Sequence, residues 1–281
     1  MASEASTCFK DHGTEMYGDD GSAELYDIAF DWRRREEADF AAACLRRYGP
    51  GGEGNALLDL GCGAGQFLQE MHSRGWHTAG VDISAPMIAR ARRRLPNEVP
   101  LEVACMSELA LAGPFDIATC WCDSLPYLLT NEKIIQHLQR VARVLKPGGI
   151  YVVDIGFNCW AHPMWHQPQG DWSPDFSGGW SATRGMLEVY HDGDEGPPCD
   201  AWSHLCTEYT YFRVSDQAGG RIIERTYTTR KRALHLQEFA ALVSASRAFE
   251  CAAWFAGAMD LRRPFESTDG RGRALVALRN G

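Results

Sequence analysis

Between residues 56 and 156, short apolar runs alternate with segments whose apolar positions recur at helical spacing. The runs ALLDL, HTAGVDI, FDIATCWC and IYVVDIGF are mainly apolar and short, which is typical of strands buried on both faces. Between them lie amphipathic segments, of which NEKIIQHLQRVARVL is the longest. The alternation predicts a parallel sheet with helices on both faces.

The pattern changes on either side of this region. Helical spacing over residues 22–47 predicts an N-terminal helical cap within 1–50, ahead of a core at 51–157. The next segment, 158–233, contains three apparent antiparallel strands, at Met186–His191, Ser203–Val214 and Arg221–Arg232. A helix and two strands within 234–281 are expected to complete the core sheet.

Composition and charge narrow the function classes. The chain has 281 residues, 45% of them hydrophobic, and a net charge of −9, which argues against a nucleic-acid partner. No apolar run approaches the roughly eighteen residues that span a bilayer, so no membrane partner is expected. The first residues lack the pattern of a signal peptide, and the ten cysteines are scattered. Reduced thiols and a cytoplasmic location are therefore expected.

The strongest motif is LLDLGCGAGQF, in which Gly61, Gly63 and Gly65 follow a predicted strand. Glycine allows a sharp turn and close approach of a ligand, and the helix that follows presents free N–H groups. An acid that suits a ribose diol, Asp82, ends the next strand. Asp59 directly precedes the turn, and a carboxylate there disfavours a pyrophosphate and favours a cationic group. The amino-acid end of S-adenosylmethionine carries such a group.

The motifs DLGCGAGQF, GVDIS, FDIATC and VLKPGG, in this order over about residues 55–157, resemble class I S-adenosylmethionine-dependent methyltransferases of the small-molecule type. The resemblance implies S-adenosyl-L-methionine as cofactor. It implies an α/β fold, a Rossmann-like seven-stranded sheet with flanking helices, here with a small antiparallel sheet inserted after strand five. The implied reaction is in-line methyl transfer to nitrogen, oxygen or carbon of a small-molecule substrate. Methyl transfer to RNA or protein, or a non-catalytic cofactor-binding relative, are the alternatives.

The resemblance also implies roles for single residues. Asp59 and the glycines would line the methionine end, Asp82 would hold the ribose hydroxyls, and Ile83 would pack on the adenine. The full set expected at the cofactor is Asp59, Gly61, Cys62, Gly63, Gly65, Asp82, Ile83, Met87, Cys105, Met106 and Cys122. Many members have Gly-Asp-Met where this chain has Ala104-Cys105-Met106, so the acceptor for the adenine amine is missing. Adenine recognition is then expected to rest on the Met106 backbone, Ser107 or Glu108.

Substrate groups are expected beyond the carboxyl ends of the strands. Asp123 and Tyr127 follow the fourth strand, and similarity to amino-sugar N-methyltransferases adds Tyr26 with Asp27. The alternative for Tyr26 is a helix tyrosine on a half-buried face, and the alternative for Tyr127 is core packing. Histidines titrate nearest neutrality, but the sequence does not choose among His162, His166, His191 and His235 as a base. The candidate catalytic residues are Tyr26, Tyr127, Asp123 and His162, and the candidate substrate-lining residues are Trp32, Phe157, Trp160 and Trp165.

Residues 157–180 contain four tryptophans and no regular period. Cys159, His162 and His166 could in principle bind zinc, but a fourth ligand at regular spacing is missing, so we expect no metal. Aromatic faces attract cations, and the stretch is interpreted as a lid over the sulfonium, with a loop packed under the added sheet as the alternative. The added sheet is expected to cap the site or to pair two copies as a homodimer. Its basic end, RTYTTRKR, is interpreted as a solvated edge rather than an anion site.

Overall fold

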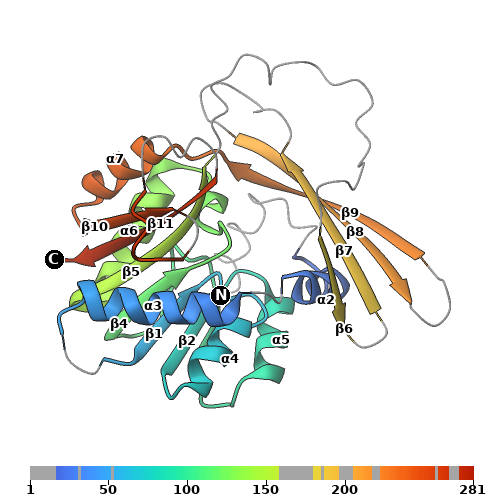
Figure 1. Cartoon of the computed structure of the whole chain (residues 1–281), viewed down its shortest axis with the longest axis horizontal. Coiled ribbons are helices and arrows are strands. Elements are labelled where there is room, and N and C mark those ends of the chain that lie inside the picture. Colours follow the sequence, from blue (N-terminus) through green and yellow to red (C-terminus); the bar gives the residue numbers. More distant parts are fainter. Residues whose placement is uncertain are drawn as a thin grey trace.

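A computed structural model describes residues 17–30, 33–51, 54–157, 180–184, 187–195, 205–216, 222–256, 259–265 and 272–281. Its central element is a seven-stranded sheet in the order β10-β11-β5-β4-β1-β2-β3 (Figure 1). Strands β1 to β5 are parallel, and β11 runs antiparallel to both β5 and β10. The strand bounds are Ala56–Leu60 (β1), His77–Asp82 (β2), Leu101–Val103 (β3), Phe115–Cys120 (β4), Leu145–Phe157 (β5), Phe249–Ala256 (β10) and Gly272–Asn280 (β11). The expected fold class is confirmed.

Helices cover both faces of this sheet. One face carries α3 (Arg34–Tyr48), α4 (Gln66–Ser73) and α5 (Ala85–Arg94), and the other carries α6 (Asn131–Val144) and α7 (Leu236–Ser246). Along β5, Ile150 and Val152 pack towards α3 and α4, whereas Tyr151 and Val153 pack towards α6 and α7. Residues 150–153 of this strand are all apolar because neither of its faces meets water there.

The N-terminal helical pattern forms two helices instead of one. Asp19 caps α2 (Asp20–Ala29) by accepting the Ser22 N–H, and α3 begins after Arg33, which has a left-handed φ of 62°. The expectation of continuous helical structure over 22–47 is therefore wrong at this break. Because of the break, the two helices pack in different places. α3 covers the central sheet, whereas α2 lies against α5 and the second sheet (Figure 1).

The second sheet is antiparallel and has the order β6-β7-β8-β9. Its strands are Trp180–Arg184 (β6), Leu187–Glu195 (β7), Leu205–Asp216 (β8) and Ile222–Arg232 (β9). The sequence predicted three of them and missed β6, which begins at the last tryptophan of the aromatic stretch. Residues 158–179 lie outside the described residues, and with them the lid and the excluded zinc site. The domain division and the pairing of two copies stay predictions. Among the helices of the described part, none is long and apolar enough to cross a membrane.

Candidate cofactor and acceptor pocket

A pocket opens at the carboxyl ends of β1, β2 and β4, between the core, α2 and β9. It brings together residues from distant parts of the chain, including the glycine turn, the end of β2 and three tyrosines. The lining residues are Tyr17, Tyr26, Gly61, Gly63, Val81, Asp82, Ile83, Met87, Ala104, Cys105, Met106, Ser124, Tyr127, Leu128 and Thr229. Nine of the residues named from the sequence are in this set. Seven were expected at the cofactor and two, Tyr26 and Tyr127, at the substrate; the seven are Gly61, Gly63, Asp82, Ile83, Met87, Cys105 and Met106.

The three glycines of the turn are required for different reasons. All three have positive φ, at 74° for Gly61, 53° for Gly63 and 80° for Gly65, a region that other residues avoid. A side chain at Gly61 would meet Ser124 at 3.1 Å, and one at Gly65 would meet Ala91 at 3.1 Å. A side chain at Gly63 would meet no protein atom within 4 Å. Gly65 therefore serves helix packing, and Gly63 leaves space open in the pocket.

Asp82 fixes the shape of the pocket beside this turn. One carboxylate oxygen accepts the Gly63 N–H at 2.8 Å, and the other accepts the Ser84 N–H at 2.8 Å. Burial raises the pKa of Asp82, and the two backbone N–H groups oppose that rise. A half-buried carboxylate that lines a pocket and keeps free lone pairs can accept hydrogen bonds from a diol.

Asp59 lies beneath the turn and is not among the lining residues. Its side chain is buried and accepts the Thr119 hydroxyl at 2.8 Å. Burial and then the nearby Glu37 raise the pKa of Asp59 to about 8, against opposing effects of Thr119 and Arg34. Asp59 is therefore mainly neutral at pH 7, and its expected role at the methionine end is indirect in this structure.

We predict a pH-dependent effect of Asp59→Asn on stability. The folded protein keeps a proton on Asp59 between about pH 4 and pH 8 that the unfolded chain has released, so this group makes stability fall as pH rises, by about 1 kcal/mol per unit. The variant lacks this loss, so its stability relative to the wild type should increase from pH 5 to pH 8. Urea unfolding at four pH values measures the difference. A difference that stays constant with pH would contradict the assignment.

On the side of the pocket where the adenine is expected, a buried histidine holds the backbone of Met106. His137 is fully buried on α6, with Nδ1 2.9 Å from the Met106 carbonyl and Nε2 2.7 Å from the Tyr151 hydroxyl. Burial lowers the pKa of His137 to about 4, so the ring is neutral at pH 7. The carbonyl can only accept, so Nδ1 donates to Met106 and Nε2 accepts from Tyr151. The Met106 backbone is thus held from the core side.

The alternatives named for adenine recognition are already engaged. Ser107 is buried, with its hydroxyl 3.1 Å from the Cys105 sulfur, and Glu108 pairs with Lys133 at 2.5 Å. Cys105 itself lines the pocket. The structure therefore brings a thiol, and no carboxylate, to the position where many similar methyltransferases have aspartate.

We predict that Cys105→Asp leaves cofactor affinity unchanged or increases it, because it places an acceptor on the pocket wall for the adenine amine. Ser107 is close enough to donate to the new carboxylate. Calorimetry with S-adenosylhomocysteine compares the variant with Cys105→Asn, which has a similar shape and no charge. Loss of binding by a folded Cys105→Asp protein would show that this wall does not face the adenine.

Three tyrosines and a threonine line the other side of the pocket. The Tyr17 and Tyr127 hydroxyls are 3.1 Å apart, and the Tyr17 ring meets the Tyr26 ring edge-on at 5.4 Å between centroids. Thr229 comes from β9. Sequence reasoning missed Tyr17, which falls in a polar segment before the first predicted helix, and Thr229, which no local pattern marks.

Two aspartates expected near the substrate are used for structure. Asp27 is buried on α2 and accepts from Gln66 at 2.6 Å and Arg94 at 3.0 Å, which joins α2 to α4 and α5. Asp123 pairs with Lys231 at 2.5 Å and accepts the Gly156 N–H at 2.7 Å. Neither of them lines the pocket.

Arg34 is a third residue that the sequence did not single out, since it is the middle one of three arginines. Its guanidinium is mostly buried, pairs with Glu37 at 2.7 Å and donates to the Phe30 carbonyl at 2.5 Å. Burial lowers the pKa of Arg34, but the nearby Cys122 and Glu37 raise it by more, so the guanidinium stays charged. Its Nε has no hydrogen-bond partner among the described residues.

The remaining predicted residues lie away from the pocket or outside the described residues. Cys62 is buried, with its sulfur against Gly80, and Cys122 donates its N–H to Asp154 at 3.0 Å; both are absent from the lining. Outside the described residues lie Trp32, Trp160, His162 and Trp165, together with the side chain of Phe157. The substrate-lining predictions thus stay predictions.

Comparison with known proteins bears on the glycine turn and the sheet around it. Residues 57–149, which contain β1 to β4, the turn and α6, match the family described as "Methyltransferase domain". This part of the chain is therefore similar to a methyltransferase domain. The resemblance drawn from the four motifs is confirmed for this part of the chain.

Relatives and solved structures extend the comparison beyond the methyltransferase domain. The chain is 33% identical over 135 residues to a dTDP-4-amino-2,3,4,6-tetradeoxy-D-glucose N,N-dimethyltransferase of Saccharopolyspora spinosa, covering 47% of this chain and 53% of that protein. The chain thus spans about half the length of the curated relatives it matches. A structure of an S-adenosylmethionine-dependent methyltransferase from Clostridium acetobutylicum aligns with a TM-score of 0.68 and 19% identity. The alignment covers 92% of this chain and 97% of that chain. The structure of S-adenosylmethionine-bound CalS10, an amino pentose methyltransferase from Micromonospora echinaspora, aligns with a TM-score of 0.62 and 23% identity. The alignment covers 88% of this chain and 92% of that chain. These two likenesses concern the fold.

Proposed function

We propose that this protein transfers a methyl group from S-adenosyl-L-methionine to an amine of a small molecule, with an amino sugar as the acceptor class to test first. The observation that carries the proposal is one continuous pocket with the glycine turn and Asp82 on one side and three tyrosines on the other. A cofactor on the first side places its methyl group towards the second. The amino-sugar relative supports the acceptor class.

The chemistry of the pocket favours nitrogen over oxygen as the acceptor atom. Methyl transfer from a sulfonium needs alignment of two partners and exclusion of water, and a base only when the nucleophile arrives protonated. Among the described lining residues, Asp82 is the single carboxylate, and histidine is missing. Tyrosine and threonine hydroxyls can orient an amine through hydrogen bonds but are weak bases. An amine that reaches the pocket as its free base needs nothing stronger.

A matched pair of acceptors tests the proposal. The purified chain is incubated with methyl-labelled cofactor and either a nucleotide-linked amino sugar or the same sugar with a hydroxyl in place of the amine. We expect label in the amino sugar, with a dimethylated product at long times, and none in the hydroxyl analogue. Label in the hydroxyl compound alone would contradict the choice of nitrogen. Label in RNA or protein pools and in neither sugar would contradict the acceptor class.

A further inference from the structure

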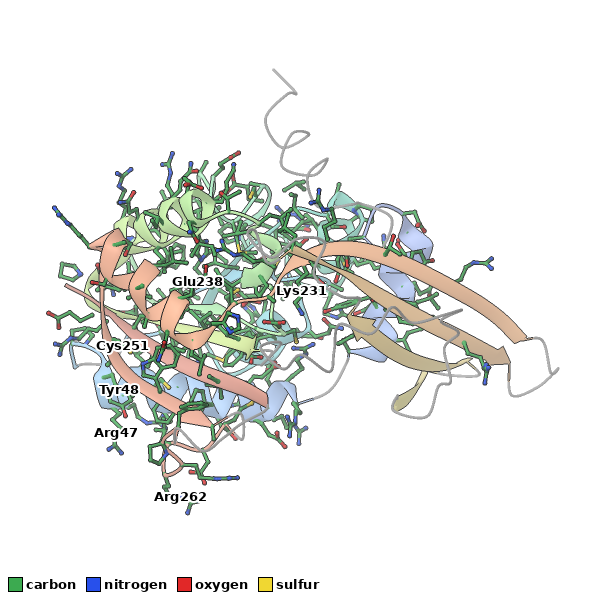
Figure 2. The ribbon with its side chains drawn as sticks, turned by 90° about the horizontal axis from the view of Figure 1, so that it is seen from above. Arg47, Tyr48, Lys231, Glu238, Cys251 and Arg262 are labelled. Carbon is green, nitrogen blue, oxygen red and sulfur yellow. The ribbon has the colours of Figure 1, made fainter. Side chains whose placement is uncertain are left out.

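The second sheet meets the core through a buried lysine. Lys231 lies at the end of β9 (Figure 2) and is 7% exposed. Its ammonium lies 2.5 Å from Asp123 Oδ2. Its neighbour Arg232 is 6% exposed and pairs with Glu238 of α7. The sequence interpretation of RTYTTRKR as a solvated edge is therefore wrong for these two residues. A buried ammonium loses its hydration and persists only with a charged partner.

Asp123 is held in a backbone conformation that needs support. Asp123 and the preceding Cys122 have φ values of 57° and 53°, and residues other than glycine are strained in this left-handed region. Strain of this kind persists where the surroundings determine the conformation. The Asp123 carboxylate bridges the Gly156 N–H and the Lys231 ammonium, and Asp154 accepts the Cys122 N–H.

Asp123 and Lys231 each lie close in the sequence to residues that line the acceptor side of the pocket. Ser124 follows Asp123 directly and lines the pocket, as does Tyr127 in the 3-10 turn η1 (Leu125–Tyr127). On β9, Thr229 lies two residues before Lys231, so both point to the same face of the strand. The ion pair between Lys231 and Asp123 therefore connects the strand that carries Thr229 with the segment that carries Ser124 and Tyr127.

We propose that Lys231 is a positioning residue for the methyl acceptor: through Asp123 its ammonium fixes the segment Ser124–Leu128, and it sets the distance between the Tyr127 and Thr229 walls. This rests on the proposed function for the identity of the pocket. Asp123 acts through its neighbours in this account and takes no proton from the substrate, because both of its oxygens are engaged.

The test compares Lys231→Met, Asp123→Asn, the double variant and the conservative Lys231→Arg. Arg230→Met is the matched control, because Arg230 is the adjacent residue of β9 and is exposed. The first readout is hydrogen exchange of the Tyr127 and Leu128 amides, which donate to Ser124 and Leu125 at 3.2 and 3.0 Å. The second is the affinity for S-adenosylhomocysteine beside the acceptor KM.

We expect Lys231→Met and Asp123→Asn to speed exchange of these amides by about ten-fold, and the double variant to do no more than either single one, as for two partners of one interaction. The acceptor KM should rise by about ten-fold while affinity for the cofactor product stays within about three-fold. In Lys231→Arg, the amide exchange rates and the acceptor KM should lie between those of the wild type and Lys231→Met. Arg230→Met should change neither the exchange rates nor the KM.

Unchanged exchange in Lys231→Met would overturn the proposal, and so would an equal loss of cofactor and acceptor affinity. If Lys231→Met does not fold, Asp123→Asn and Lys231→Arg carry the same comparison. Wild-type protein without methyl transfer to any acceptor would count against the proposed function instead. The exchange measurements would still decide whether Lys231 holds the segment.

Discussion

Replacing Gly63 by valine should abolish binding of S-adenosyl-L-methionine while the protein stays folded. Gly63 lines the pocket at a φ of 53°, and a side chain built there meets no protein atom within 4 Å. The substitution therefore costs only backbone strain, about 1–2 kcal/mol, within the protein itself. The added methyl groups fill space that the ligand would need. We expect calorimetric affinity to fall by at least about 100-fold, which is about 2.7 kcal/mol of binding free energy.

Gly75→Val provides the matched control for this variant. Gly75 also has a positive φ, 84°, and also has no atom within 4 Å of a built side chain, but it lies in the exposed turn after α4. The two variants should lose similar stability in urea unfolding, and only Gly63→Val should lose binding. Affinity within about three-fold of the wild type in a folded Gly63→Val protein would show that the ligand does not approach this turn.

Asp82→Ala should weaken cofactor binding by about 1–3 kcal/mol, the range for a charge-assisted hydrogen bond. The carboxylate lines the pocket and also holds the Gly63 N–H, so its removal takes away a hydrogen-bond acceptor for the ribose and loosens the turn. Asp82→Asn keeps one acceptor and the side-chain shape, so its affinity should lie between those of the wild type and the alanine variant. Calorimetry with S-adenosylhomocysteine measures all three.

Asp116→Ala separates this effect from general destabilisation. Asp116 is likewise a buried aspartate of the central sheet that accepts a backbone N–H, from Ala56 at 3.0 Å, but it lies at the amino end of β4, opposite the pocket. Its removal should lower the free energy of unfolding and leave cofactor affinity unchanged. Equal losses of affinity in Asp82→Ala and Asp116→Ala would remove Asp82 from the ribose position.

Local sequence determined the parallel core and the cofactor side of the pocket. Strands covered on both faces are mainly apolar, so a run such as IYVVDIGF is recognisable as a buried strand in the sequence. The turn needs residues that tolerate positive φ, so Gly61, Gly63 and Gly65 mark it by residue type. An acid at the end of the next parallel strand reaches the same edge of the sheet, which brought Asp82 beside Gly63.

Only the tertiary structure decided the acceptor side and the state of the buried charges. Thr229 and Tyr17 reach the pocket because β9 and the residues just before α2 lie across the strand ends, and no local pattern encodes that contact. The sequence does not reveal the charge state of Asp59 or the partner of Lys231. In the folded protein, burial keeps Asp59 protonated near pH 7, and the buried Lys231 pairs with Asp123. Charge, protonation and pairing depend on how much water the fold removes around a group, and the chain settles that only when distant segments pack together.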